Sequence, residues 1–129
     1  MITLILRFDK KMRLLQAKEF SAVMQGHRSH RNHFFRIYVL PNTLGIPRLG
    51  LTVSKKTNRH ANKRNRIKRI VREWFRLQQR IFPAVDIVVQ ARCAYQKKEC
   101  LQFWEALHEL DQLISNQYSH EASSFKAIG

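Results

Sequence analysis

The sequence predicts an α+β fold, a small two-layer sandwich with the element order α-β-β-α-β-α. Apolar residues recur at helical spacing in three segments, 17–25, 64–80 and 97–117. Alternating or β-branched residues fill three others, 34–40, 48–54 and 86–91. A chain of 129 residues with 44% hydrophobic content is long enough for one modest core. We therefore expect one domain, residues 1–129, in which helices and a small sheet share that core.

The first half of the chain is expected to hold one short helix and two strands. The helix at 17–25 has an apolar face, and Gly26 is suited to end it. Residues 27–33 are polar and basic, which is typical of a loop. The strands at 34–40 and 48–54 are separated by proline, asparagine and glycine, so we expect them to pair as a hairpin.

The second half begins with a basic loop at 55–63, which leads into the long helix at 64–80. Pro83 lies just past its end. The strand at 86–91 is rich in β-branched residues, which predicts burial on both faces. The last helix, at 97–117, has an apolar stripe made of Leu101, Trp104, Leu107, Leu110 and Ile114.

Charge is distributed unevenly along the chain. The net charge is +15, with a pI near 10.8. Residues 1–98 hold 23 bases and 4 acids, a net of +19, whereas residues 99–129 hold 1 base and 5 acids, a net of −4. Such a charge favours an anionic partner, either nucleic acid or an acidic membrane. The last segment is not expected to form part of the anion-binding surface.

The termini and cysteines indicate a protein of the cytoplasm. Cys93 and Cys100 form no Cys-x-x-Cys motif, so we interpret them as free thiols. The apolar run at 2–6 is too short for a signal peptide or a membrane span. No membrane partner is therefore expected. Residues 1–12 and 118–129 are expected to be loosely ordered.

The helix at 64–80 is the strongest functional signal. Its bases recur every four residues, at Arg64, Lys68, Arg72, Arg76 and Arg80. Like charges at this spacing destabilise a helix, and Glu73 is the one acid within it. A polyanion offsets that repulsion, and arginine suits bidentate contact with phosphate. Asn65 either orients a neighbour or contacts a nucleic-acid base or sugar, or it caps the helix.

These residues belong to a longer pattern. It reads Val53-Ser54-Lys55-Lys56, a short loop, Arg64-Asn65-Arg66-Ile67-Lys68-Arg69-x-x-Arg72-Glu73-x-Phe75-Arg76, and then Asp86-Ile87-Val88-Val89. The pattern resembles the bacterial ribonuclease P protein component. The resemblance extends from Arg13-Leu14 and Glu19-Phe20 to the last helix, and its arginine-asparagine-arginine motif is highly specific. Residues 57–63 differ in lacking the glycine that many members carry after the two lysines.

The resemblance implies a fold in which the basic helix joins two parallel strands by a left-handed crossover, against the general rule. It also implies two binding surfaces. The surface for the catalytic RNA subunit consists of Arg64, Asn65, Arg66, Lys68, Arg69 and Arg72. A cleft between the first helix and the sheet holds the single-stranded 5′ leader of precursor tRNA, and consists of Phe20, Met24, Arg36, Tyr38, Ser54, Lys55, Lys56, Ala91 and Arg92.

The resemblance further implies that the RNA subunit carries out the reaction. That reaction is Mg²⁺-dependent endonucleolytic removal of the 5′ leader, with Mg²⁺ bound mainly by the RNA subunit and the substrate. The expected partners are therefore ribonuclease P RNA and precursor tRNA. The residues agree, since Asp9, Glu19, Glu73 and Asp86 are scattered and form no paired-carboxylate site. We expect no catalytic residue and no metal ligand in the protein.

Other functions remain as alternatives. A structural RNA-binding protein of the ribosomal type has the same charge and size but no dependence on a 5′ leader. A protein-only nuclease needs clustered carboxylates, and a helix-turn-helix DNA binder does not suit strands flanking the basic helix. His27, His30 and His33 are spaced three apart, but they lie in a basic segment without nearby acids, so RNA-facing polarity is favoured over a metal site.

Overall fold

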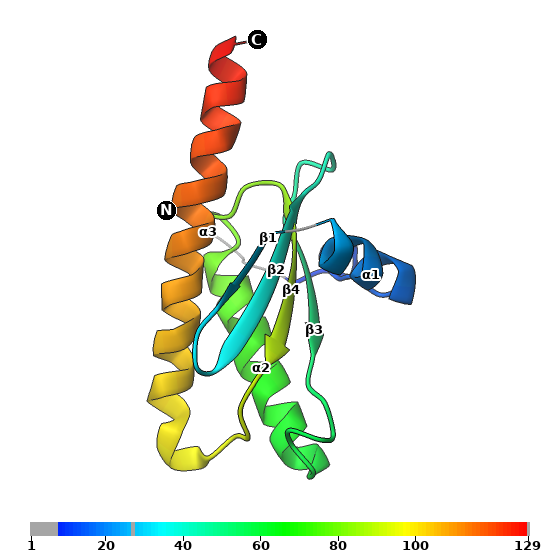
Figure 1. Ribbon diagram of the computed structural model, residues 1–129, viewed down its shortest axis with the longest axis vertical. Coiled ribbons are helices and arrows are strands. Elements are labelled where there is room, and N and C mark those ends of the chain that lie inside the picture. The colour runs from blue at the N-terminus through cyan, green and yellow to red at the C-terminus, as the bar shows by residue number, and fades with distance from the viewer. Residues whose placement is uncertain (1–7, 27, 129) are drawn as a thin grey trace, which may run out of the picture.

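The computed structural model describes residues 8–26 and 28–128, with side chains placed for 8–26 and 28–118. It is an α+β structure with a four-stranded sheet (Figure 1). The elements in chain order are η1 (Lys10–Met12), α1 (Ala17–Gln25), β1 (Arg28–Arg31), β2 (Phe35–Pro41), β3 (Arg48–Thr52), α2 (Ala61–Gln78), β4 (Val85–Ala91), η2 (Lys97–Glu99) and α3 (Cys100–Ile128).

The sheet has the strand order β1-β2-β4-β3. β2 is antiparallel to β1 and β4, with Tyr38 opposite both Ser29 and Val88. β3 is parallel to β4, with Gly50 opposite Val88. In Figure 1, β3 runs downward, α2 returns behind the sheet, and β4 runs downward on the left of β3. This connection is a left-handed crossover, as the resemblance implied.

One face of the sheet packs against α2 and α3. Side chains alternate between the two faces of a strand, so Ile37, Val39, Ile87 and Val89 all point into this layer. Ile67, Ile70, Val71, Trp74 and Phe75 meet them from α2, and Phe103, Leu107, Leu110 and Ile114 meet them from α3. The indole Nε1 of Trp74 donates to Asp111 Oδ2 at 3.0 Å, which joins the two helices inside the core.

Among the described helices, α1 packs against the opposite face. A small buried cluster forms there, made of Leu14, Val23, Tyr38 and Val88. The row beyond it along the strands, with Arg36 opposite Gln90 and Gln90 opposite Thr52, is half-buried. α1 therefore covers part of this face and leaves a polar part beside it.

Three predicted features of the sheet and helices are wrong. The strands at 34–40 and 48–54 do not pair as a hairpin, because β4 lies between them. Residues 28–31 form an edge strand rather than a loop, since backbone hydrogen bonds to β2 do not require apolar side chains. Leu101 is not part of the apolar stripe of α3, because its side chain is 74% exposed.

Several element boundaries also differ from the prediction. α2 begins at Ala61, before the expected Arg64, with His60 at the N-cap position. α3 continues to Ile128, past the expected end near 117. Before α1, Phe8 packs against Phe75 and Met12 is buried, so residues 8–12 have fixed contacts. The apolar run at 2–6 lies outside the described residues.

None of the helices, within the described part of the chain, is long and apolar enough to span a membrane.

Candidate nucleic-acid interface

The outward face of α2 is a cationic surface. Asn65, Arg69, Arg72 and Arg76 lie along it and, together with Phe8 and Glu73, line a shallow groove of about 310 Å³. Arg76 pairs with Glu73 at 2.6 Å, and this pairing lowers the pKa of Glu73. Asn65, Arg69 and Arg72 are exposed. The groove can therefore hold a polyanion through Arg69 and Arg72 with Asn65 as a neutral donor and acceptor.

The bases that the sequence placed on one stripe separate into different environments. The guanidinium of Arg64 turns back to the preceding loop, where Nη1 donates to the carbonyl oxygens of Asn58 and Arg59, each at 3.0 Å. Arg66 faces the segment after β4, while Lys68 faces β3. Arg80 lies beyond the end of the helix. Arg64 therefore positions the loop that precedes α2. Asn65 is exposed within α2, whose N-cap is His60, so the interpretation of Asn65 as the helix cap is wrong.

Asn58 holds the basic loop in place. It is 1% exposed. Its Oδ1 accepts the backbone N–H of Tyr95 at 2.7 Å, and its Nδ2 donates to the Cys93 carbonyl at 3.3 Å. Among the described residues only Gly45 has a positive φ, so Asn58 does not replace the missing loop glycine by adopting left-handed geometry. The sequence gives little indication of this role, since an asparagine within a basic loop does not by itself predict burial.

The two predicted surfaces meet at the edge strand β3. Lys68 and Arg72 of α2 line a cavity of about 170 Å³ together with Phe20 of α1 and Gly50 of β3. A Cβ atom added to Gly50 would lie 2.7 Å from the ring of Phe20. The missing side chain at Gly50 thus lets the ring rest directly on the strand. Sequence reasoning did not identify Gly50, because its partner is thirty positions away in the chain.

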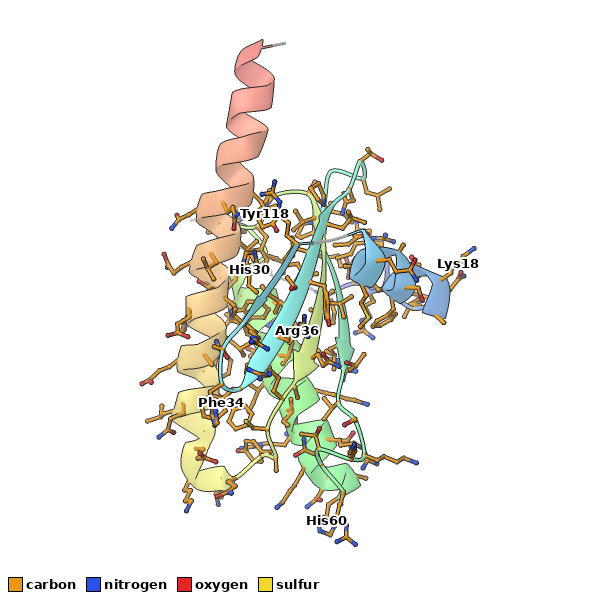
Figure 2. All side chains as sticks on the ribbon, in the orientation of Figure 1. Lys18, His30, Phe34, Arg36, His60 and Tyr118 are labelled. Atoms are coloured by element: carbon orange, nitrogen blue, oxygen red, sulfur yellow. The ribbon has the colours of Figure 1, made fainter. Side chains whose placement is uncertain are left out.

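Arg36 and Tyr38 lie side by side on the same face as α1. The guanidinium carbon of Arg36 is 5.2 Å from the centroid of the Tyr38 ring, a cation–π geometry. Tyr38 is 8% exposed and belongs to the buried cluster under α1, while Arg36 is half-buried. The Nε of Arg36 is buried without a hydrogen-bond partner among the described residues. Figure 2 shows Arg36 on the open part of the sheet, beside the area that α1 covers.

The remaining predicted cleft residues divide into three kinds. Lys55 and Lys56 are exposed in the loop after β3, where the hydroxyls of Ser54 and Thr57 are 2.9 Å apart. Met24 packs against the cluster under α1. Arg92 is exposed and donates to the carbonyl oxygen of Asn32.

Ala91 does not line the cleft. It lies opposite Phe35 in the sheet and belongs to the core under α2 and α3. Its position at the end of β4, next to Arg92 in the sequence, suggested that it lines the cleft together with Arg92. Gln90, the preceding residue of β4, points to the α1 face beside Arg36, so Ala91 points to the opposite face, toward α2 and α3.

An ion-pair network fixes α1 to the sheet. Arg48 donates through Nη2 and Nε to both oxygens of Asp86, at 2.7 and 2.8 Å, and through Nη1 to Glu19 Oε2 at 2.8 Å. The other oxygen of Glu19 accepts the backbone N–H of Gln16 at 3.0 Å. The Gln16 N–H and Arg48 both lower the pKa of Glu19. The network therefore joins a helix, an edge strand and a central strand beside the cleft.

The histidines do not form a shared site. His30 meets the ring of Tyr118, with centroids 6.3 Å apart, whereas His33 meets Phe34 at 4.8 Å. His27 lies outside the described residues. Across the part of the chain that the structure describes, no group of three or more His, Cys, Asp or Glu side chains is arranged to hold a metal ion.

Sequence comparison agrees with this geometry. A family model described as Ribonuclease P matches residues 8–115. The ribonuclease P protein component of Chromobacterium violaceum is 42% identical over 104 residues, which cover 81% of this chain and 86% of that protein. The same component from Proteus mirabilis is 41% identical over 105 residues, covering 81% of this chain and 88% of that protein.

Solved structures show the same fold. The RNase P protein of Staphylococcus aureus aligns with a TM-score of 0.73 at 31% identity, covering 79% of this chain and 94% of that one. The RNase P protein of Thermotoga maritima aligns with a TM-score of 0.65 at 31% identity, covering 81% and 96%. The basic helix, the crossover and the cleft beside α1 thus occur in a chain that belongs to the ribonuclease P protein component family.

Proposed function

We propose that this protein is the protein subunit of ribonuclease P and that it assists the catalytic RNA in removing the 5′ leader from precursor tRNA. One observation carries the proposal. Lys68 and Arg72, on the cationic face of α2, share a cavity with Phe20 of α1 at the edge of β3. An RNA held along α2 therefore lies next to a cleft suited to a single strand.

The cationic face of α2 is proposed to bind the RNA subunit. Arg69 and Arg72 are exposed on a helix whose opposite side is buried in the core. A rigid array of this kind displaces the counterions condensed on RNA. It also keeps the arginine side chains at a fixed spacing opposite the RNA phosphates. Arg66 and Lys68 extend the array to either side of the groove.

The cleft beside α1 is proposed to hold the leader. Single-stranded RNA is commonly bound by aromatic rings within a basic groove. Phe20 supplies a half-buried ring, and Arg36 and Tyr38 supply a cation against a ring. Lys55 and Lys56 add exposed charge at the end of β3.

The protein's share of the reaction is then electrostatic and positional. Its cations reduce the repulsion between substrate and RNA subunit, and its cleft holds the leader. Hydrolysis is assigned to the RNA subunit, with Mg²⁺ held mainly by that RNA and the substrate. This role would place the protein in the bacterial cytoplasm.

A cleavage assay tests the proposal directly. Precursor tRNA is incubated at low Mg²⁺ with bacterial ribonuclease P RNA alone, with the protein alone, and with both. Cleavage only in the mixture is the expected result. Cleavage by the protein alone would indicate a protein-only nuclease. A folded, RNA-binding protein that gives no stimulation would instead be a structural RNA-binding protein.

A further inference from the structure

A second cationic groove lies beside α2, on the side away from β3. Its volume is about 820 Å³, and it is bordered by the first turns of α2 and by the segment between β4 and α3. The lining includes four exposed bases, Lys63, Arg66, Lys97 and Lys98. Each residue lining the groove lies in the described part of the chain, and none is acidic. The four charges therefore have no neutralising carboxylate within the groove.

Tyr95 places a buried polar group at the base of this groove. The residue is 5% exposed, and its hydroxyl oxygen makes no hydrogen bond of ordinary geometry. The hydroxyl nevertheless interacts with the guanidinium of Arg66 and raises the pKa of that arginine. A buried hydroxyl without a good partner is unfavourable, so a bound acceptor would stabilise this arrangement.

The groove is built on buried contacts. The backbone N–H of Tyr95 donates to the buried amide of Asn58, and the ring of Tyr95 lies 5.3 Å from that of Phe103. Asn58 also binds the carbonyl of Cys93, and its own carbonyl accepts from Arg64. The segment bearing Lys97 and Lys98 is therefore held against α2 by the folded core.

We propose that this groove binds the phosphate backbone of an RNA strand. Its volume exceeds what a single phosphate group needs. Its lysine and arginine side chains come from two segments of the chain, so they can contact consecutive phosphates of one strand. Lysines contact phosphates as point charges, and Arg66 adds a bidentate donor. The proposal rests on the proposed function for the identity of the RNA. The phosphates belong to either the RNA subunit or the precursor tRNA, and the test separates these sources.

The test compares two lysine pairs in equivalent settings. Lys97→Ala/Lys98→Ala removes two exposed charges from η2 in the groove, and Lys10→Ala/Lys11→Ala removes two exposed charges from η1, outside it. Protein affinity for ribonuclease P RNA is measured across a salt series, and precursor-tRNA affinity is measured with the assembled complex. We expect the η2 pair to weaken binding on the order of tenfold near 0.1 M salt and to reduce the salt slope by about 2.

The two measurements identify the strand. A loss in binding to ribonuclease P RNA assigns the groove to the RNA subunit. A loss confined to precursor-tRNA binding assigns it to the substrate. If the η2 pair changes neither affinity nor slope more than the η1 pair does, the groove is not an RNA site and the proposal is overturned.

Tyr95→Phe tests the groove without removing charge. The ring keeps its contact with Phe103, while the hydroxyl is lost, so we expect weaker binding by several-fold with an unchanged salt slope. An unchanged affinity would remove Tyr95 from the site. Wild-type cleavage is measured in the same preparations, so the proposed function is tested separately. If the wild-type protein fails to stimulate cleavage but the Lys97→Ala/Lys98→Ala variant still weakens RNA binding, the proposed function is contradicted and the RNA-binding groove is retained.

Discussion

The face of the sheet under α2 and α3 differs from the face under α1 in how completely helices cover it. Under α2 and α3, strand residues such as Ile37 and Val89 are at most 1% exposed, and two helices meet over them. Under α1 the buried cluster is small, and the row through Arg36 stays half-buried and polar. The comparison shows that most of the buried core lies on one face of the sheet, whereas the other face keeps a partly exposed polar row.

The largest expected effect lies on the fully covered face. Trp74→Ala removes a side chain that is 0% exposed and leaves the buried carboxylate of Asp111 without its indole donor. We expect a loss of about 3–5 kcal/mol in the free energy of unfolding, measured by urea denaturation. Leu101→Ala, at a 74% exposed position, should change it by less than about 0.5 kcal/mol. Similar losses for both variants would contradict this comparison.

A smaller effect is expected where α1 touches the sheet. Gly50→Ala places a methyl group against the ring of Phe20, so the ring must move away from the strand. We expect a cost of about 1–3 kcal/mol in stability, together with a weaker preference for precursor over mature tRNA.

The control is the same substitution in a Phe20→Ala background. Without the ring there is much less for the new methyl group to displace, so Gly50→Ala should cost less in stability there. Fully additive losses in the double variant would show that Gly50 does not set the position of Phe20.

The open part of the α1 face should affect binding more than stability. Arg36→Met keeps much of the side-chain length beside Tyr38 but removes the charge. We expect precursor-tRNA affinity to fall while mature-tRNA affinity is kept, with a salt slope lower by about 1. Lys18→Met, an exposed position directed away from the sheet in Figure 2, is the matched control. An equal loss for both tRNAs would remove Arg36 from the leader cleft.

The smallest expected effect is on the stability that Glu19 contributes by joining α1 to Arg48 of the sheet. The pKa of Glu19 is lowered by the Gln16 N–H and by Arg48, so its carboxylate stabilises the fold above the ordinary glutamate pKa of about 4.3. That stabilisation is lost as the pH falls through the lowered pKa. We expect Glu19→Gln to reduce the melting temperature at pH 7 and to have little effect at pH 3. A constant difference at both pH values would contradict the assignment.

Much of the fold was predictable because its signals are local. The helical spacing of apolar residues in 64–80 correctly predicted a helix, and the structure shows that its apolar residues Ile67, Ile70, Val71 and Trp74 are buried. β1 was missed because Arg28–Arg31 is an edge strand whose side chains are mainly exposed, so no apolar pattern marks it. The predicted hairpin was wrong because strand pairing is decided by the whole sheet, and a short turn does not exclude a strand inserted between its flanks.

The candidate site, like the fold, was predicted from the sequence only in part. By itself the sequence determined that one helix would be cationic outside and apolar inside, because helical spacing relates each residue to its own axis. Only the tertiary structure decided which cations remain available. Arg64 donates to loop carbonyls, Lys68 lines the cavity that also contains Phe20, and Arg66 lies beside Tyr95. The reason is that helical periodicity sets a side chain's direction, whereas the neighbours it meets come from segments distant in the chain.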